Sequence, residues 1–152
     1  NDKWKKNISN IVDKVKEAII ITLDEVDFDK KIELSIKLTS DKEMKELNYK
    51  FRGKPHVTNV LSFPQDKAGA CIFNSPNYIG DIALGFKKVN EEAFQQKKTL
   101  TAHLIHLIIH GLLHLIGYDH KNDVQSITME ELEIRILNLL GYKNPYFVKQ
   151  ID

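Results

Sequence analysis

The sequence has little of what marks several specialised classes of protein. Its 152 residues include one cysteine, Cys71, which excludes an internal disulfide framework and suits a reducing compartment. The formal net charge is only +1, which excludes a generic polycation that binds nucleic acid through charge alone. The first residues lack the apolar core of a secretory signal. We therefore expect a cytoplasmic protein that folds as one domain over residues 1–152.

One apolar run, residues 100–116, is close to the lower length limit for crossing a bilayer. It contains four histidines, His103, His106, His110 and His114. Polar groups such as these are costly in the hydrocarbon of a membrane. A helix that is apolar on all sides is typical of the centre of a soluble protein. The run therefore predicts a buried core helix whose histidines face a cleft, with no association with membranes.

Periodicity predicts an α/β (α+β) fold in which helices pack around a small mixed sheet. Apolar residues at helical spacing predict a helix over 4–24, and alternation predicts a strand over 32–38. Ser40 and Glu43 form a capping box that opens a helix ended by Gly53. The other expected elements are strands at 57–63 and 78–85, helices at 90–95, 100–116 and 127–140, and a mobile loop at 69–77.

Residues 110–120 read H-G-L-L-H-L-I-G-Y-D-H and carry the most informative pattern. His110 and His114 are four residues apart in a helical run, so their rings project from one face. Gly117 allows the chain to leave the helix, and the following turn returns His120 toward the same point. Three neutral imidazoles with a fourth position left for water are typical of catalytic zinc. A structural zinc site would close that position with another ligand, most often cysteine, and none lies nearby.

The spacing also matches the zinc helix of metzincin peptidases, H-E-x-x-H-x-x-G-x-x-H, except at one position. Gly111 stands where those enzymes carry the glutamate that acts as general base, and glycine cannot take a proton from water. Glycine inside a helix costs roughly 1 kcal/mol relative to alanine. Glycine at this position indicates that a substrate or another backbone approaches the helix closely. Simple close packing of the helix is the alternative.

Three further blocks accompany the histidine motif in the sequence. They are Phe51-Arg52-Gly53-Lys54 with T-N-V-L-S-F-P at 58–64, Gly80-Asp81-Ile82, and G-Y-K-N-P-Y at 141–146. In this order the four blocks resemble the YbeY family of bacterial metal-dependent endoribonucleases. The resemblance implies cleavage of single-stranded RNA in rRNA maturation, at the 3′ end of the small-subunit 16S rRNA, and a role in ribosome quality control. It further implies a precursor rRNA substrate, ribosome-associated protein partners and no DNA substrate.

Arg52 is the strongest candidate outside the histidines. Phosphodiester cleavage builds negative charge on the phosphorus oxygens, and a guanidinium matches phosphate geometry bidentately. Arg52 lies in a stretch where Lys50, Lys54 and Lys67 outnumber Asp66, so a basic side could follow the phosphates. The alternatives are pairing at a helix end and a solvated face with scattered lysines. The expected catalytic residues are Arg52, His110, His114 and His120, of which the three histidines are the metal ligands.

Several residues are candidates for supporting roles. Asp81, Asp119 and Glu133 could hold the second ring nitrogen of a ligand histidine. Thr58 and Ser62 could donate to a phosphate or only cap a strand end. The remaining candidates are His106, either a support for the site or a satisfied core histidine; His103, structural or exposed; His56, at the surface; and Tyr118, a packing residue.

We expect one divalent ion per chain, zinc or another ion in the cell, that lowers the pKa of its bound water toward about 7 beside the scissile phosphate. Arg52 would stabilise the charged transition state. No glutamate follows His110, so the metal hydroxide or the RNA 2′-hydroxyl would serve as base. Two alternatives stay open: a zinc metallopeptidase-like hydrolase, against which Gly111 argues, and a non-catalytic ribosome assembly factor that uses metal for folding.

Overall fold

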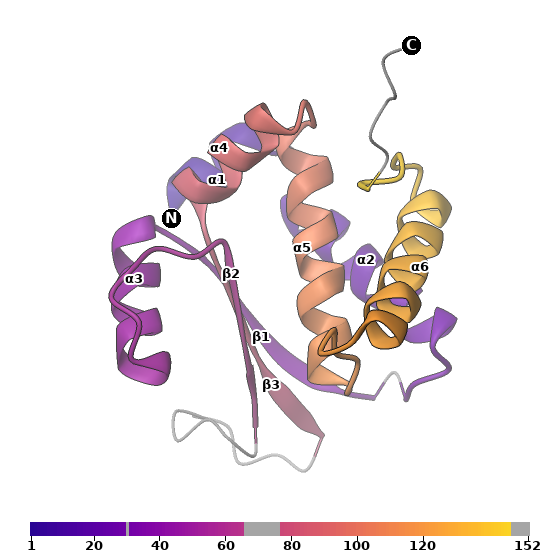
Figure 1. Cartoon of the computed structure of the whole chain (residues 1–152). Helices are drawn as coiled ribbons and strands as arrows, with labels where there is room; N and C mark the ends of the chain where they lie inside the picture. Colours follow the sequence, from indigo (N-terminus) through magenta and orange to yellow (C-terminus); the bar gives the residue numbers. More distant parts are fainter. Residues whose placement is uncertain (30, 66–76, 147–152) are drawn as a thin grey trace.

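The computed structural model describes residues 1–29, 31–65 and 77–146, in which helices cover a small sheet (Figure 1). The helices are α1 (Asp2–Asn7), α2 (Ile11–Glu25), α3 (Asp41–Arg52), α4 (Phe86–Gln95), α5 (Leu100–Leu115) and α6 (Asp123–Leu139). The strands are β1 (Glu33–Thr39), β2 (Val60–Pro64) and β3 (Tyr78–Gly85). Three residues named above, Asp66, Lys67 and Cys71, lie outside the described residues, as does nearly all of the loop predicted at 69–77.

The sheet has the strand order β1-β3-β2, so β3 is its central strand. β1 runs parallel to β3, with Ser35 opposite Asp81. β2 runs antiparallel to β3, with Ser62 opposite Ile82. The mixed sheet predicted from the sequence is confirmed.

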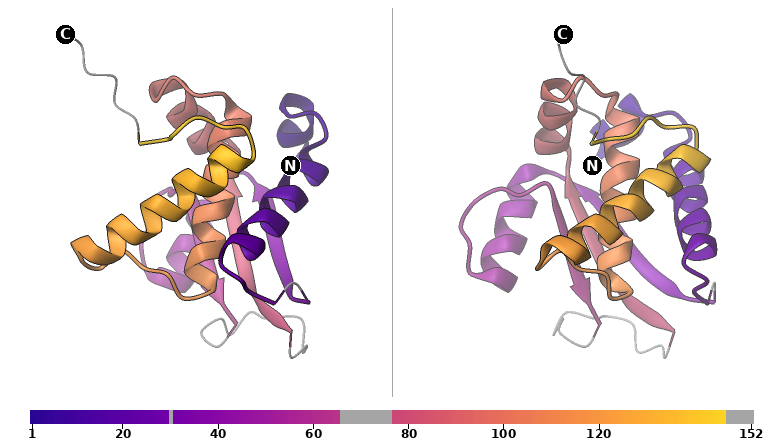
Figure 2. Two further views of the ribbon diagram at one scale, coloured as in Figure 1. Left: turned by 90° about the vertical axis from the view of Figure 1, so that its right-hand side faces the viewer. Right: turned by 45° about the vertical axis from the view of Figure 1, so that its right-hand side comes forward.

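Different helices cover the two faces of the sheet. Successive side chains of a strand point to opposite faces. Ile82 and Leu84 of β3 therefore join the main core beneath α5, whereas Ala83 packs with Met44 of α3 on the other face. Figure 1 shows α3 and α5 on opposite sides of the strands, and Figure 2 shows α2 and α6 beside α5.

α5 is the core helix, as its apolar sequence predicts. Its most deeply buried side chains are each at most 1% exposed: Leu104, Ile105, Ile108, Ile109, Leu112 and Leu113. Burying one such side chain stabilises the fold by roughly 1.5–3 kcal/mol. No helix in the described part of the chain is long and apolar enough to cross a membrane.

The single helix predicted over 4–24 is wrong, because the chain forms α1 and α2 with a break between them. Asn7 and Asn10 flank the break, and asparagine side chains compete with the helical backbone for hydrogen bonds. Asn10 has a φ of 52°, a left-handed conformation that asparagine tolerates better than most residues. Ile8 and Ile11 are both buried across the break, which is why the apolar spacing alone predicted one helix.

The break allows α1 to place Trp4 in the core. Trp4 is 1% exposed, and its Nε1 donates a hydrogen bond to the carbonyl oxygen of Thr39 at 3.0 Å. Its ring meets the ring of Phe86 edge to face, with 5.2 Å between the centroids. α1 therefore links the end of β1 to the start of α4.

The ends of α3 agree with the sequence, because Ser40 caps it and Gly53 ends it with a φ of 66°. The Ser40 side chain accepts from the Glu43 amide, which is one of the two hydrogen bonds of the predicted capping box. The Glu43 carboxylate accepts hydrogen bonds from Lys37 and Thr39 of β1. α3 is thereby fixed to the strand that precedes it.

Three other elements begin at positions that the sequence did not predict. α4 begins at Phe86 instead of near residue 90. In its first turn the Lys88 amide donates to Asp41, which lies in a distant part of the sequence, at 3.1 Å. α6 begins one turn early because Asn122 caps it. β2 begins at Val60 instead of residue 57, because the side chain of the preceding asparagine accepts from the Val60 amide at 2.6 Å.

The role of α1 can be tested with Trp4→Phe. The substitution leaves the buried Thr39 carbonyl without its donor and removes ring volume, so the free energy of unfolding should fall by about 1–3 kcal/mol. Urea unfolding followed by circular dichroism measures the change. Lys5→Ala, on the exposed side of α1, is the matched control and should stay within about 0.5 kcal/mol. An unchanged unfolding midpoint for Trp4→Phe would contradict the place of α1 in the core.

Candidate metal centre and adjoining cleft

Three histidine rings meet at the C-terminal end of α5. The Nε2 atoms of His110 and His114, one turn apart on the helix, are 3.0 Å apart. The ring centroid of His120 lies 5.7 Å from that of His110 and 4.9 Å from that of His114. One ring nitrogen from each histidine lies within 4.8 Å of the other two, so the group could hold a metal ion. The convergence predicted from the spacing of these residues is confirmed.

The turn after α5 brings His120 back toward the helix. Gly117 has a φ of +110°, which glycine adopts without strain. The Tyr118 amide then donates to the carbonyl oxygen of Leu113 at 2.9 Å and closes the helix end. Asp119 accepts from the backbone amide of His120 at 2.8 Å, which fixes the last step of the turn.

His110 and His114, the two members of this group on α5, each have a hydrogen-bond partner at the second ring nitrogen. Nδ1 of His110 lies 3.0 Å from Glu133 Oε1, and Nδ1 of His114 lies 3.0 Å from the carbonyl oxygen of Tyr118. A carboxylate and a carbonyl only accept, so each Nδ1 carries a hydrogen, and in the neutral form of each ring Nε2 has the lone pair. Burial, with the neighbouring His110 and His120, also lowers the pKa of His114 and favours its neutral form. These donors therefore fit a divalent metal ion.

Glu133 of α6 is a buried charge beside the three histidines. It is 1% exposed, and its Oε1 accepts from Nε2 of His106 at 2.9 Å and from Nδ1 of His110. Burial alone would raise the pKa of Glu133, but the hydrogen bonds from His106 and His110, together with the positive charge of these rings when they are protonated, outweigh burial and hold this pKa at about 2. Glu133 is therefore ionised at neutral pH. Glu133 accepts from the second ring nitrogen of His110, which is the role considered for it from the sequence. His106 is buried and supports Glu133 through its own hydrogen bond.

The other two carboxylates considered for that role have different partners. Asp119 accepts from the backbone of His120, not from its ring. Asp81 accepts from the hydroxyl group of Tyr78. Within the described ranges no hydrogen bond joins Asp81 to a histidine of the group.

Gly111 is explained by close packing between α5 and the sheet. A Cβ atom at this position would lie 3.0 Å from Ser62 Oγ and 3.2 Å from Ile82 Cγ2, closer than side chains normally approach. Ser62 also donates to the carbonyl oxygen of Gly111 at 3.3 Å, which ties β2 to the helix. A glutamate at position 111 would therefore point into the strands. The space beside Gly111 is therefore filled by Ser62 and Ile82, not left open for a substrate.

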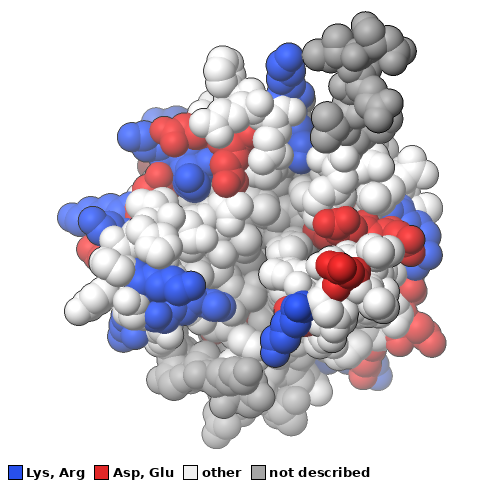
Figure 3. Space-filling model, viewed as in Figure 1, with Lys and Arg blue, Asp and Glu red and all other residues white. Residues whose placement is uncertain are grey.

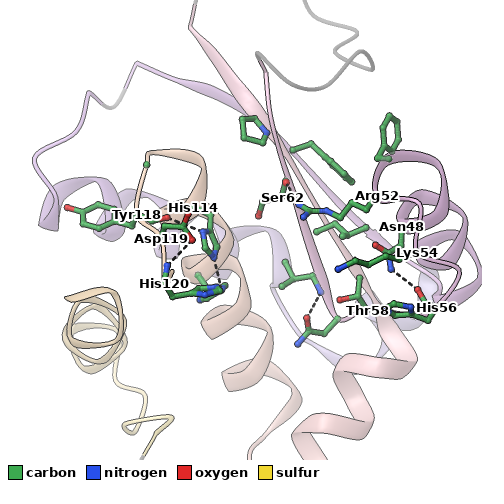
Figure 4. A pocket seen from close by; sticks show the side chains of 18 residues that line it. Asn48, Arg52, Lys54, His56, Thr58, Ser62, His114, Tyr118, Asp119 and His120 are labelled. Carbon is green, nitrogen blue, oxygen red and sulfur yellow. Dashed lines mark hydrogen bonds between the residues drawn. The ribbon is translucent and has the colours of Figure 1, made fainter. Parts of the chain in front are cut away.

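A cleft of about 800 Å³ adjoins the three histidines. Figure 4 shows His114 and His120 on one wall, with Arg52, Lys54 and His56 on the wall opposite. The first wall is formed by α5 and the turn after it, and the second by α3, β2 and the loop between them. In Figure 3 basic side chains gather over α3 on one side of the hollow, and acidic side chains gather over α6 on the other.

Arg52 is exposed at the end of α3 and is anchored on the second wall. Its Nη2 donates to the carbonyl oxygen of Ser62 at 3.1 Å, and its guanidinium lies 5.9 Å from the centre of the Phe63 ring. The contact is with β2, not with a helix end. A guanidinium has five N–H donors, so this hydrogen bond leaves donors for a ligand. His56 and Thr58 also line this wall.

A second, partly buried polar cluster had no counterpart in the sequence predictions. His103, expected to be structural or exposed, is buried, and its Nε2 lies 3.0 Å from Glu92 Oε1. The same carboxylate oxygen accepts from Asn59 Nδ2 at 2.9 Å, and Asn59 lines the cleft. α4 and α5 therefore hold the loop before β2 in place. Nothing in the spacing of Glu92 indicates this, because the contact depends on how distant elements pack.

Known proteins resemble this chain over most of its length. A family model described as Endoribonuclease YbeY matches residues 1–141. A protein of Chelativorans sp. (strain BNC1), named Endoribonuclease YbeY, is 42% identical over 132 residues, or 87% of this chain and 80% of that protein. A protein of the same name from Wigglesworthia glossinidia brevipalpis is 44% identical over 124 residues, or 79% and 78%. The solution structure of TM1509 from Thermotoga maritima has a TM-score of 0.57 and 25% identity, and the match covers 95% of this chain and 93% of that one.

Proposed function

The chain belongs to the YbeY family of endoribonucleases, which functions in rRNA maturation, and from this premise we propose that His110, His114, His120 and Arg52 form its active site. The observation that carries the proposal is that both walls of one cleft bear the required chemistry. A group able to hold a metal ion lies on one wall, and an anchored guanidinium lies on the other.

The three histidines would hold one divalent ion, which we propose to be zinc. Three neutral nitrogen ligands leave one position of a tetrahedral zinc ion for a non-protein ligand. When bound, such an ion supplies Lewis acidity and lowers the pKa of water toward about 7. Glu133 and the Tyr118 carbonyl hold the rings of His110 and His114 in the tautomer that this requires.

Arg52 would bind the scissile phosphate from the opposite wall. Negative charge grows on the phosphorus oxygens as the phosphodiester bond breaks, and a guanidinium can meet two of those oxygens at once. The hydrogen bond to Ser62 holds the side chain in place before the substrate arrives. The site therefore does not have to order a long, mobile side chain at the moment of reaction.

The second wall also suits single-stranded RNA. Phe51 and Phe63 line the cleft with their ring centroids 5.1 Å apart, and Lys54 lies on the same wall. Recognition of single strands typically combines aromatic rings that stack with bases and cations that follow phosphates. We propose precursor rRNA as the substrate, with cleavage at the 3′ end of 16S rRNA, ribosome-associated proteins as partners, and a cytoplasmic location.

The packing of Gly111 weighs against the peptidase alternative. A general base at position 111 would have to displace Ser62 and Ile82 before it could reach the histidines. A purely structural role for the metal would not require the open cleft beside it. The nucleophile would accordingly be water that the bound ion makes more acidic, or the RNA 2′-hydroxyl group, and either would release its proton to solvent.

The ligand assignment predicts that the purified protein binds about one zinc ion per chain and that His114→Ala binds far less, because two nitrogen ligands hold zinc poorly. Elemental analysis after dialysis measures the metal content. His56→Ala is the matched control, since His56 is exposed and lines the same cleft outside the histidine group. A full complement of zinc in His114→Ala would show that the ligands lie elsewhere.

If Arg52 binds the scissile phosphate, Arg52→Ala should keep the fold and the zinc but cleave RNA more slowly. The loss of rate should correspond to roughly 2–4 kcal/mol of transition-state stabilisation. Arg52→Lys should recover only part of the rate, because an ammonium keeps the charge but not the planar fork. Single-turnover cleavage of an unstructured RNA measures both variants. Lys45→Ala removes a positive charge from the exposed side of α3 and should cleave normally. Normal cleavage by a folded, zinc-loaded Arg52→Ala would remove Arg52 from the site.

A further inference from the structure

Tyr146, which follows α6 in the chain, reaches the buried carboxylate behind the histidine group. Its hydroxyl group donates to Glu133 Oε2 at 3.0 Å and lies 3.2 Å from Nε2 of His106. Its ring meets the His106 ring edge to face, with 5.4 Å between the centroids. The segment that carries it is itself anchored: the Tyr142 amide donates to Leu137 of α6, and the Tyr146 amide donates to the side chain of Asn144.

We propose that Tyr146 is a positioning residue of the metal centre, which holds Glu133 so that Glu133 can hold His110. The inference rests on the metal site proposed above and extends it to the segment after the last helix. The chain of contacts runs from the Tyr146 hydroxyl to Glu133 Oε2, and from Glu133 Oε1 to Nδ1 of His110.

The geometry gives the two oxygens of Glu133 separate partners. Oε1 is shared by His106 and His110, while Oε2 accepts from Tyr146. In the described part of the chain, Tyr146 is the one donor to Oε2. Without it, the carboxylate could rotate about its terminal bond, and a buried charged oxygen would lose its partner. Burial and the charge of Glu133 raise the pKa of Tyr146, so its hydroxyl group keeps the hydrogen that it donates.

Glu133 determines the tautomer and the ring orientation of His110. The alignment of the Glu133 carboxylate therefore affects the affinity of the site for the metal ion. Partners that hold a ligand histidine typically change metal affinity 10–100-fold when they are removed. Tyr146 acts one step further away, so we expect an effect at the lower end of this range. A tyrosine that only pinned the end of the chain would change stability and leave the metal affinity of the folded protein unchanged.

Tyr146→Phe tests the proposal because it keeps the ring against His106 and removes only the hydroxyl group. Zinc titration of the folded protein against a chromogenic chelator should give a dissociation constant roughly 10-fold higher. The metal-free protein should stay folded, with a melting temperature lowered only by the loss of one buried hydrogen bond. Tyr142→Phe, in the same segment but packed against the apolar core, is the matched control and should bind zinc normally. Unchanged zinc affinity in Tyr146→Phe would overturn the proposal.

A double-mutant cycle with Glu133→Gln tests whether Tyr146 acts through Glu133. If it does, the double variant should bind zinc about as weakly as Glu133→Gln alone, because the two losses are not additive. Fully additive losses would overturn the proposal that Tyr146 acts through Glu133. If Glu133→Gln does not fold, the comparison of zinc affinity between Tyr146→Phe and Tyr142→Phe still tests the proposal. Failure of zinc binding in the unaltered protein would overturn the metal site together with this inference. Normal binding there with no change in Tyr146→Phe would overturn the inference alone.

Discussion

The packing of α5 is the constraint on which the rest of the molecule depends. The helix is the centre of the apolar core and also carries two of the three converging histidines. Its buried side chains fix its rotation between the sheet and the surrounding helices, and Gly111 lets it lie close against β2 and β3. Because a helix presents residues four apart on one face, fixing that rotation aims His110 and His114 at the same point. The core and two of the three histidines are therefore positioned by one element.

The buried carboxylate of Glu133 connects that helix to α6. Burying a charge costs several kcal/mol unless hydrogen bonds compensate. His106 and His110, on one face of α5, provide that compensation, and Tyr146 adds a donor from the segment after α6. The same contacts that stabilise the charge orient the ring of His110. His106 therefore contacts the histidine group through Glu133, although it does not line the cleft.

Local patterns in the sequence predicted the features whose causes are local. The spacing of His110, His114 and His120 predicted their convergence, and Ser40 and Gly53 predicted the ends of α3. The family resemblance, carried by short motifs, is confirmed by the match over residues 1–141. Two features that depend on distant contacts were missed. They are the early start of α4, where Asp41 accepts from the Lys88 amide, and the cluster that joins Asn59 to Glu92. The break between α1 and α2 was hidden because the apolar spacing runs through it.

We propose that one metal ion, held by three histidines and faced by Arg52, makes this cleft a nuclease site for single-stranded RNA. The most direct test is single-turnover cleavage of an end-labelled, unstructured RNA by metal-free protein as zinc is added, beside a duplex of the same sequence. We expect no cleavage without metal, a rate that rises and levels off at about one ion per chain, and little cleavage of the duplex. Cleavage of the single strand that persists at full rate after the metal is removed would contradict it.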